Sequence, residues 1–351
     1  MVGSVSDLQM RYFATAIQGI GPILRDELTG ADGVTLTYET EFDGRNDLVP
    51  FEARSFDPNQ IRTCEDVYAS VNEVASKHDA RKLSSELCTS NLLERSLSVY
   101  AAQARPLKTR MTFRVVARVL SEEQFMRTEL RDAMVATISQ ARPRWTHADP
   151  AELEFWVLET KPGFFRLGLR LTGAEMRHRG GRAVERQGAT KPTLAAAMVL
   201  VAGKPATLPL LDATCGTGTI LREGLVAGWD VVGSDIDAAA VDAATTNAQG
   251  AHLLSADARR LPFGPSSFGA ITCNLPFGKQ YRVPGAFGEW VHEVLEELLR
   301  VSVAGAPIVL LIPSTESFMK ALARVPALQL IRNYNLRLLG EPTALWVLRH
   351  V

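Results

Sequence analysis

The side chains best suited to chemistry in this chain lie in its second half, where two acids and two glycines recur at short spacing. Asp212 opens the sequence Asp-Ala-Thr-Cys-Gly-Thr-Gly-Thr, and Asp235 follows 23 residues later. Gly216 and Gly218 let the backbone approach a ligand that a Cβ atom would exclude. A carboxylate at Asp235 suits a bidentate hydrogen bond to the two hydroxyls of a ribose. These residues predict a nucleotide-like ligand at the glycine turn.

Two acceptors in the sequence Asn274-Leu275-Pro276-Phe277 are suited to binding an amine. The side-chain oxygen of Asn274 and the backbone carbonyl of Leu275 can accept from the N–H groups of an exocyclic amine and hold its nitrogen nearer to tetrahedral geometry. Pro276 rigidifies the turn, and Phe277 offers a face on which a flipped base can stack. The plainer alternative is that Asn274 caps a turn and Phe277 lies in a core.

A parallel sheet would bring these groups together. Four short buried strands are expected, and a polar residue follows each of them: residues 208–211, 230–234, 252–255 and 268–273. A helix is expected over residues 220–227, directly after the glycine turn. In a doubly wound sheet the carboxyl ends of such strands line the ligand site, so Asp257, after the third strand, can accept from an adenine amino group.

An NAD-binding domain is the competing interpretation of this strand, glycine turn and helix. The dinucleotide fingerprint requires a third glycine at position 221, where the chain has Leu221. Such a domain also has no use for Asn-Leu-Pro-Phe after the fourth strand. The glycine turn, the two acids and Asn-x-Pro-aromatic, in this order, instead resemble the class I S-adenosylmethionine methyltransferases, whose amino-methylating motif is Asn/Asp/Ser-x-Pro-aromatic.

This resemblance implies S-adenosylmethionine as the cofactor and four residues as the catalytic group: Asn274, Leu275, Pro276 and Phe277. The residues implied to bind the cofactor are Thr190, Thr193, Asp212, Cys215, Gly216, Thr217, Gly218, Asp235, Ile236, Asp257, Ala258 and Asn274. Three later strands would complete a seven-strand sheet, and they are expected at residues 307–312, 328–334 and 344–348. Two helices are expected between them and the earlier strands, at residues 287–303 and 316–323. Because Asn is not a base near neutral pH, the amine proton is expected to leave after the transfer, to water or a nearby group.

The first half of the chain predicts two α+β segments. In the first segment, one helix begins near Pro22 and another at Thr63, which would cap it. The second helix would extend through Val67, Val71 and Val74. With strands expected at residues 11–16, 34–38 and 48–53, this order suggests a small ferredoxin-like unit. A helical stretch, a basic loop, a strand, a helix and a hairpin follow: residues 82–104, 105–110, 113–120, 121–140, and 153–159 with 164–171.

The segment from the basic loop to the hairpin resembles a THUMP domain, which is an RNA-binding module. Arg177-His-Arg-Gly-Gly-Arg-Ala and Gly188-Ala-Thr-Lys-Pro-Thr-Leu resemble the linker and first catalytic helix of THUMP-containing RNA methyltransferases. The implied fold class is α/β, with a Rossmann-like methyltransferase sheet and an α+β RNA-binding half. The implied parts are a ferredoxin-like domain at 1–80, a THUMP domain with its connecting helix at 81–172, a linker at 173–187 and the methyltransferase domain at 188–351.

Charge is unevenly distributed along a chain whose net charge is −1. Residues 100–191 contain 17 Lys and Arg against 10 Asp and Glu, and the remainder is acidic. A basic middle segment favours a polyanion partner, although a solvated face is the plainer alternative. The residues expected to contact RNA are Arg105, Lys108, Arg110, Arg177, Arg179, Arg182, Lys191 and Lys279.

The four cysteines form no close pair and have no histidine cluster near them, so a zinc site is not expected. Free thiols indicate a reducing cytoplasm. The N-terminus has no apolar signal region, and no apolar run reaches about 18 residues. We expect a soluble cytoplasmic protein that binds neither a membrane nor a metal ion.

Within the THUMP-containing enzymes, Asn-Leu-Pro-Phe-Gly most resembles the tRNA guanine-N2 methyltransferases. This implies methylation of the exocyclic N2 amine of a guanosine in the acceptor-stem region of tRNA. Three alternatives stay open. They are a ribosomal RNA methyltransferase, including one that confers drug resistance; a natural-product or DNA amino-methyltransferase; and an RNA-binding protein whose catalytic domain is inactive.

Overall fold

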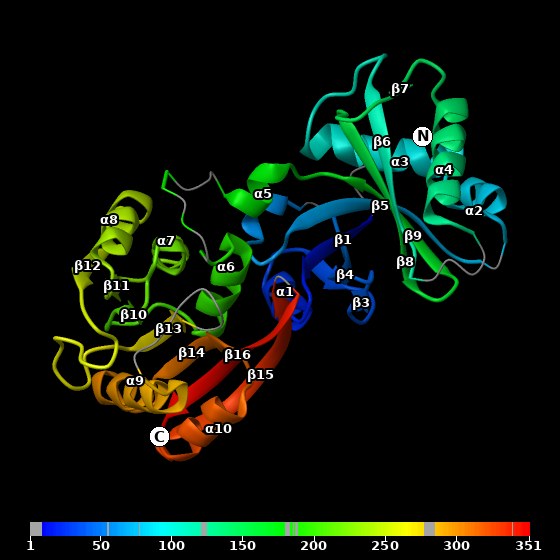
Figure 1. Ribbon diagram of the computed structural model, residues 1–351. Coiled ribbons are helices and arrows are strands. Elements are labelled where there is room, and N and C mark those ends of the chain that lie inside the picture. Colours follow the sequence, from blue (N-terminus) through cyan, green and yellow to red (C-terminus); the bar gives the residue numbers. More distant parts are fainter. Residues whose placement is uncertain are drawn as a thin grey trace. The chain divides into compact units, whose positions relative to one another are not determined.

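The computed structural model describes residues 9–54, 56–76, 78–120, 125–179, 183–184, 186, 189–276, 285–338 and 340–351 (Figure 1). The chain divides into two compact units, Met1–Arg177 and His178–Val351. Each unit is built around one sheet, with nine strands in the first unit and seven in the second. The predicted α/β fold class with a seven-strand sheet in the second half is therefore confirmed.

The second unit has a mostly parallel sheet whose strand order is β12-β11-β10-β13-β14-β16-β15. The strands are β10 (Leu210–Asp212), β11 (Val231–Asp235), β12 (His252–Ser255), β13 (Ala270–Asn274), β14 (Pro307–Ile312), β15 (Leu328–Leu338) and β16 (Glu341–His350). Strands β10 to β14 are parallel, whereas β16 is antiparallel to both β14 and β15. The order reverses at β10, which pairs with β11 on one side and β13 on the other. A reversal of this kind is where a doubly wound sheet opens a crevice for a ligand.

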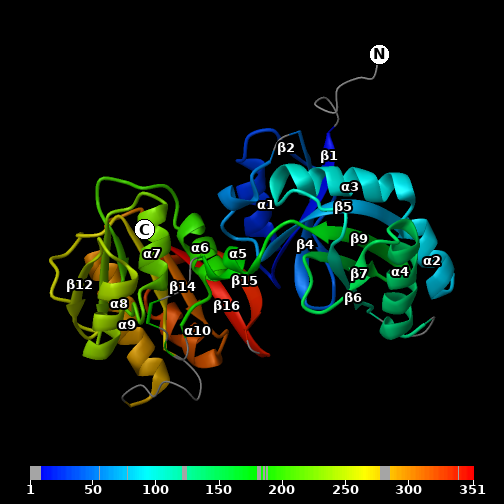
Figure 2. The ribbon, with the colours of Figure 1, turned by 90° about the horizontal axis from the view of Figure 1, so that it is seen from above.

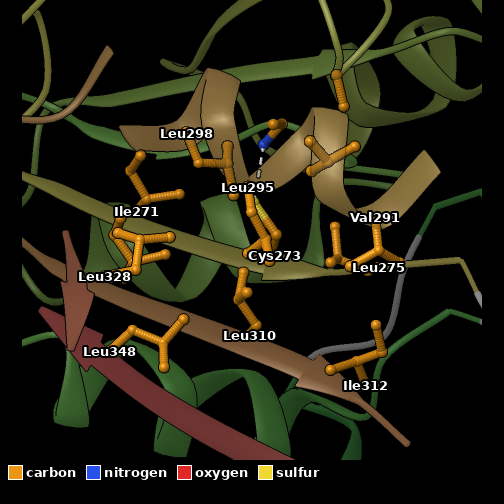
Figure 3. Close-up of a cluster of buried hydrophobic side chains, with 14 of the residues drawn as sticks. Ile271, Cys273, Leu275, Val291, Leu295, Leu298, Leu310, Ile312, Leu328 and Leu348 are labelled. Atoms are coloured by element: carbon orange, nitrogen blue, oxygen red, sulfur yellow. Dashed lines mark hydrogen bonds between the residues drawn. The ribbon is translucent and has the colours of Figure 1, made fainter. Parts of the chain in front are cut away.

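Helices cover both faces of this sheet (Figures 1 and 2). They are α6 (Pro192–Val201), α7 (Thr219–Val226), α8 (Ala238–Asn247), α9 (Phe287–Val301) and α10 (Glu316–Ala323). Alternate residues of the central strands, such as Ile271 and Cys273, pack against Val291, Leu295 and Leu298 of α9 in one buried cluster (Figure 3). The apolar residues on that face of the strands are buried under α9, as expected for a sheet that helices cover.

The first unit has the strand order β2-β4-β1-β5-β9-β8-β6-β7, and β3 pairs with β4 beside this path. The strands are β1 (Met10–Ile17), β2 (Val34–Leu36), β3 (Glu41–Phe42), β4 (Asn46–Ala53), β5 (Asp66–Ala75), β6 (Thr112–Arg118), β7 (Thr146–His147), β8 (Leu153–Lys161) and β9 (Phe164–Arg170). The helices are α1 (Gly21–Thr29), α2 (Ala80–Leu87), α3 (Ser90–Gln103), α4 (Arg127–Ala141) and α5 (Ala174–His178), with a 3₁₀ turn at Pro58–Gln60. Because β5 pairs with β9, one sheet extends through both segments expected as separate domains. The domain boundaries at residues 80, 172 and 187 stay predictions.

One predicted element is wrong. The helix expected from Thr63 through Val67, Val71 and Val74 is strand β5. The register of β5 against β9 shifts between Ser70 and Asn72, and such a shift breaks the simple alternation that marks a strand. Thr63 caps no helix: its N–H and hydroxyl both donate to the carboxylate of Glu27, at 3.0 and 2.6 Å.

Other predicted bounds shift by a few residues, and the differences are larger in two helical stretches. The stretch 82–104 is two helices, because α2 ends at Leu87 and α3 begins at Ser90. The helix expected from residue 121 begins at Arg127, and residues 121–124 lie outside the described residues. The hairpin of β8 and β9 is confirmed, as are the bounds of α10. Among the helices that the structure describes, none is long and apolar enough to cross a membrane.

Candidate active site

Three polar residues predicted from the sequence end three neighbouring strands of the second unit. Asp212 ends β10, Asp235 ends β11 and Asn274 ends β13. Since β10 is hydrogen-bonded in parallel to both of the others, the three carboxyl ends meet at one edge of the sheet. Asp257 follows β12, the outermost strand on the β11 side.

The glycine turn after β10 is tied to the end of β11. The N–H of Cys215 donates to the Ser234 carbonyl at 2.9 Å, and the N–H of Gly216 donates to Oδ2 of Asp235, also at 2.9 Å. Gly216 has a φ of +51°, and a Cβ added there would meet no heavy atom of the described residues within 4 Å. The backbone of Gly216 therefore faces open space, as a backbone that binds a ligand closely must.

Gly218 serves a different purpose. It has a φ of +78° at the start of α7, and a Cβ there would lie 3.1 to 3.2 Å from atoms of Ala244 and Ala248. The absence of a side chain thus lets α7 approach α8 closely. That both glycines make room for a ligand stays a prediction, since the structure shows open space at Gly216 and close helix packing at Gly218.

Asp235 is held by backbone groups on both sides. Its Oδ2 accepts from Gly216, and its Oδ1 accepts from the N–H of Asp237 at 3.0 Å. The next residue, Ile236, has 71% of its surface exposed. A carboxylate in a fixed orientation beside an exposed apolar side chain can bind a ribose while an adenine ring packs against Ile236.

Asp212 is fully buried. Its Oδ1 accepts from the N–H of Thr214 at 3.2 Å, and its Oδ2 has no hydrogen-bond partner among the described residues. Burial is the main reason that the pKa of this carboxyl is raised to about 8. A positively charged ligand group near the end of β10 would favour the ionised form of the Asp212 carboxyl and would be attracted to it.

Asp257 is less available than the sequence suggested. Arg259, two residues later, donates to it from Nε at 3.1 Å and from Nη2 at 2.7 Å. This hydrogen bonding lowers the pKa of the Asp257 carboxyl. An adenine amino group would share the carboxylate with Arg259, a neighbour that the sequence reasoning missed. Ala258, between them, is buried.

Asn274 is held at two points. Its side-chain Nδ2 donates to the Thr190 hydroxyl at 2.9 Å, and its backbone carbonyl accepts from the Thr214 hydroxyl at 3.0 Å. Its Oδ1 is buried and has no partner among the described residues. A buried acceptor without a partner costs free energy, so this oxygen is suited to an incoming donor.

Other predicted site residues lie in or near these segments. Leu275 donates from its N–H to the Leu311 carbonyl at 3.2 Å, and its side chain lies in the buried cluster of Figure 3. Thr193 is buried in the first turn of α6, and the hydroxyl of buried Thr217 has no partner among the described residues. Cys215 is also buried, which raises the pKa of its thiol well above the usual range. Pro276 is partly buried, and Phe277 lies outside the described residues.

The residues predicted to contact RNA fall into different environments. Arg105, Lys108 and Arg110 are exposed on the loop between α3 and β6, and Lys108 forms a 2.7 Å ion pair with Glu152. Arg177, in the first unit, lies 3.9 Å from the carboxylate of Asp66.

Four more of these residues were assigned to the second half of the chain. The backbone carbonyl of Arg179 accepts from Arg222 Nη2 at 2.8 Å. Lys191 is exposed where α6 begins. Arg182 and Lys279 lie outside the described residues. Within the part of the chain that the structure describes, no group of three or more His, Cys, Asp and Glu could hold a metal ion.

Comparison with known proteins identifies relatives of the second unit. Residues 179–340 match the family described as UPF0020, RMKL-like, methyltransferase domain. The U6 snRNA (guanine-N(2))-methyltransferase THUMPD2 of Mus musculus is 32% identical over 130 residues, which are 35% of this chain and 24% of the mouse protein. The chain thus spans about a quarter of the length of that curated relative.

Solved structures share the fold over nearly the whole chain. TrmN from Thermus thermophilus has a TM-score of 0.77 and 21% identity, and the match covers 97% of this chain and all of TrmN. SMU.472, crystallised as a complex with SAH, has a TM-score of 0.66 and 16% identity, with 98% of each chain covered. At these identities the likeness establishes the fold.

Proposed function

Because residues 179–340 match the family described as RMKL-like methyltransferase domains, we propose that this chain transfers a methyl group from S-adenosylmethionine to the exocyclic N2 amine of a guanosine in RNA. The observation on which the amine assignment rests is Asn274. It presents a buried side-chain oxygen, unpaired among the described residues, at the strand end next to the glycine turn. The name of the mouse relative, a guanine-N2 methyltransferase, supports guanine as the base.

The residues at the sheet edge fit S-adenosylmethionine. The open face of Gly216 can admit the cofactor against the backbone, Asp235 can accept from its ribose hydroxyls, and Ile236 can pack against its adenine. The Oδ2 atom of Asp212, which has no hydrogen-bond partner among the described residues, can face its ammonium group. When bound, the cofactor supplies an electrophilic methyl group on its sulfonium.

The protein's own contribution to the reaction is alignment of the amine. The lone pair of a guanine amine is delocalised into the ring, which makes the nitrogen a poor nucleophile. Acceptance of its two N–H groups by Asn274 Oδ1 and by the Leu275 carbonyl holds the nitrogen nearer to tetrahedral geometry and directs its lone pair away from the ring. The amide of Asn274 takes up no proton near neutral pH, so the amine proton leaves to solvent after the transfer.

The first unit would deliver the RNA. We assign it a THUMP-like role in binding tRNA, with the exposed loop of Arg105, Lys108 and Arg110 contacting phosphates. The substrate position in this proposal is the acceptor-stem region of tRNA. Ribosomal RNA and U6 snRNA are the alternatives that the test must separate.

Mass spectrometry of nucleosides tests the proposed function directly. Purified protein with S-adenosylmethionine is incubated separately with unmodified tRNA, ribosomal RNA and U6 snRNA, and each RNA is digested to nucleosides. The expected product is N2-methylguanosine in tRNA, formed far more slowly by the Asn274→Ala variant. Methylation of ribosomal RNA or U6 snRNA alone would change the substrate, and methylation of adenine would refute the amine assignment.

A further inference from the structure

We propose that Thr190 is a positioning residue for methyl transfer: its hydroxyl sets which end of the Asn274 amide faces the substrate amine. The inference rests on the proposed function, since it takes Asn274 as the group that accepts from that amine. It gives Thr190 a role different from the cofactor contact that the family resemblance implies.

The geometry joins two segments distant in the sequence. Thr190 precedes α6, 84 residues before Asn274, and its Oγ1 lies 2.9 Å from Asn274 Nδ2. The Thr214 hydroxyl meanwhile donates to the Asn274 carbonyl at 3.0 Å. The backbone and the NH₂ group of Asn274 are therefore both held, and Oδ1 is left buried without a partner among the described residues.

An asparagine amide needs such a restraint because its two ends have similar shape and opposite hydrogen-bonding character. If the amide turned over, its NH₂ group would face the N–H groups of the substrate, and two donors would meet. The Thr190 hydroxyl accepts from Nδ2 and so favours the orientation in which Oδ1 faces outward. A threonine methyl group at the same position contributes nothing to this choice, so the hydroxyl is the part to test.

Substitution of Thr190 by Val and by Ser separates the hydroxyl from the shape of the side chain. Thr190→Val keeps the branched shape and should lower kcat about tenfold or more, since the hydrogen bond that fixes the Asn274 amide is lost and its NH₂ group can then turn towards the substrate amine. Its dissociation constant for S-adenosylhomocysteine, measured by calorimetry, should stay within about threefold. Thr190→Ser keeps the hydroxyl and should restore most of kcat. A kcat of Thr190→Val equal to that of the wild type would overturn the proposal.

A double-mutant cycle with Asn274→Asp distinguishes positioning from a general structural role. A carboxylate has two equivalent oxygens, so it presents an acceptor whichever way it turns. Thr190→Val should therefore lower kcat much less in the Asn274→Asp protein than in the wild type. An equal loss in both would mean that Thr190 acts without orienting the residue at position 274.

A measurement without turnover keeps this inference separate from the proposed function. The side-chain NH₂ resonances of Asn274 in the full chain are identified by their loss in Asn274→Ala. They should shift in Thr190→Val and be retained near their original position in Thr190→Ser. If they do not move in Thr190→Val, the inference fails even when the enzyme methylates RNA. If they move as expected and no RNA is methylated, the proposed function fails instead.

Discussion

The N–H of Gly216 donates to the carboxylate of Asp235 across 2.9 Å, so the glycine turn after β10 is held in place by the end of β11. Asp235 thus has two tasks in the proposed site. It holds the turn through one oxygen, and we expect its remaining acceptor capacity to bind the ribose hydroxyls. A substitution there removes both the ribose contact and the support of the turn.

We therefore expect Asp235→Ala to lose cofactor affinity. Unpaired ribose hydroxyls and a released Gly216 N–H should cost on the order of 1–3 kcal/mol of binding free energy. Calorimetry with S-adenosylhomocysteine measures this loss. The matched control is Asp242→Ala, which removes an exposed acid from the following helix, α8. Unchanged affinity in Asp235→Ala would refute the cofactor assignment.

Asn274→Ala should separate turnover from cofactor binding. The side-chain oxygen of Asn274 is expected to act mainly in the transition state, so kcat should fall by about a hundredfold or more. Single-turnover kinetics and calorimetry give the two quantities. Asn335→Ala, which changes an exposed residue of β15, serves as the control for loss of an asparagine. Near-normal single-turnover rates would remove Asn274 from the mechanism.

Stability should depend on pH through Asp212. Its pKa is raised to about 8 in the folded protein, whereas an unfolded aspartate titrates near pH 4. Between these values the folded state holds more protons at Asp212, so the contribution of Asp212 to the free energy of unfolding is greatest below about pH 4 and is lost as pH rises to about 8. Asp212→Asn should remove this contribution, which denaturant melts of both proteins at several pH values would measure.

Asp66 also changes the free energy of unfolding with pH in this range, so its effect must be distinguished from that of Asp212. Burial raises the pKa of its carboxyl to about 6, despite the nearby Arg170. Its contribution should therefore disappear between about pH 4 and pH 6. The difference between the wild type and Asp212→Asn isolates the change above pH 6. Parallel curves for the two proteins across that range would show that Asp212 does not titrate there.

RNA binding by the first unit should be electrostatic. Replacement of Arg105, Lys108 and Arg110 by Ala should weaken tRNA binding and make its salt dependence less steep, by about 0.7–0.9 in the logarithmic slope for each phosphate that the variant no longer neutralises. Electrophoretic shifts at several salt concentrations measure both effects. The control is Lys204→Ala, which changes an exposed lysine of the second unit. An unchanged slope would exclude this loop from the interface.

A shortened chain that starts near residue 188 tests whether the second unit binds the cofactor alone and the first unit binds the RNA. The strand ends and the glycine turn remain in it, so it should bind cofactor with little loss of affinity. It should lose most activity on full-length tRNA, because the proposed RNA-binding half is gone. If it methylates tRNA as well as the whole chain, the first unit does not deliver RNA, and a natural-product substrate becomes the leading alternative.

The sequence predicted the ends of β10, β11 and β13 well because each of these strands is short, mostly buried and ends in a polar residue. Such a pattern gives the ends of β10, β11 and β13 directly, and parallel pairing brings them together. The helix expected from Thr63 failed for the opposite reason. Strand β5 is paired on both sides and its register shifts at Ser70, so its valines have a spacing that also suits a helix.

Hydrogen bonds between segments distant in the sequence could not be predicted. Nothing in the spacing of Thr190 and Asn274 shows that their side chains meet. The contact of Arg259 with Asp257 could have been predicted, because a basic residue two positions after an acid at a turn can fold back and bind its carboxylate. Local charge pairing is thus a signal that could have corrected the expectation for Asp257.

Leu275 has two roles in the proposed site. Its backbone carbonyl is one of the two proposed acceptors, and its side chain is part of the hydrophobic core. Its side chain is buried with Val291 and Leu295 of α9 (Figure 3), while its backbone directly follows β13. A change in the packing of α9 would therefore move the Leu275 carbonyl as well as loosen the fold. Core substitutions in α9 that conserve apolar character should therefore change the rate of the proposed methyl transfer as well as the stability of the fold.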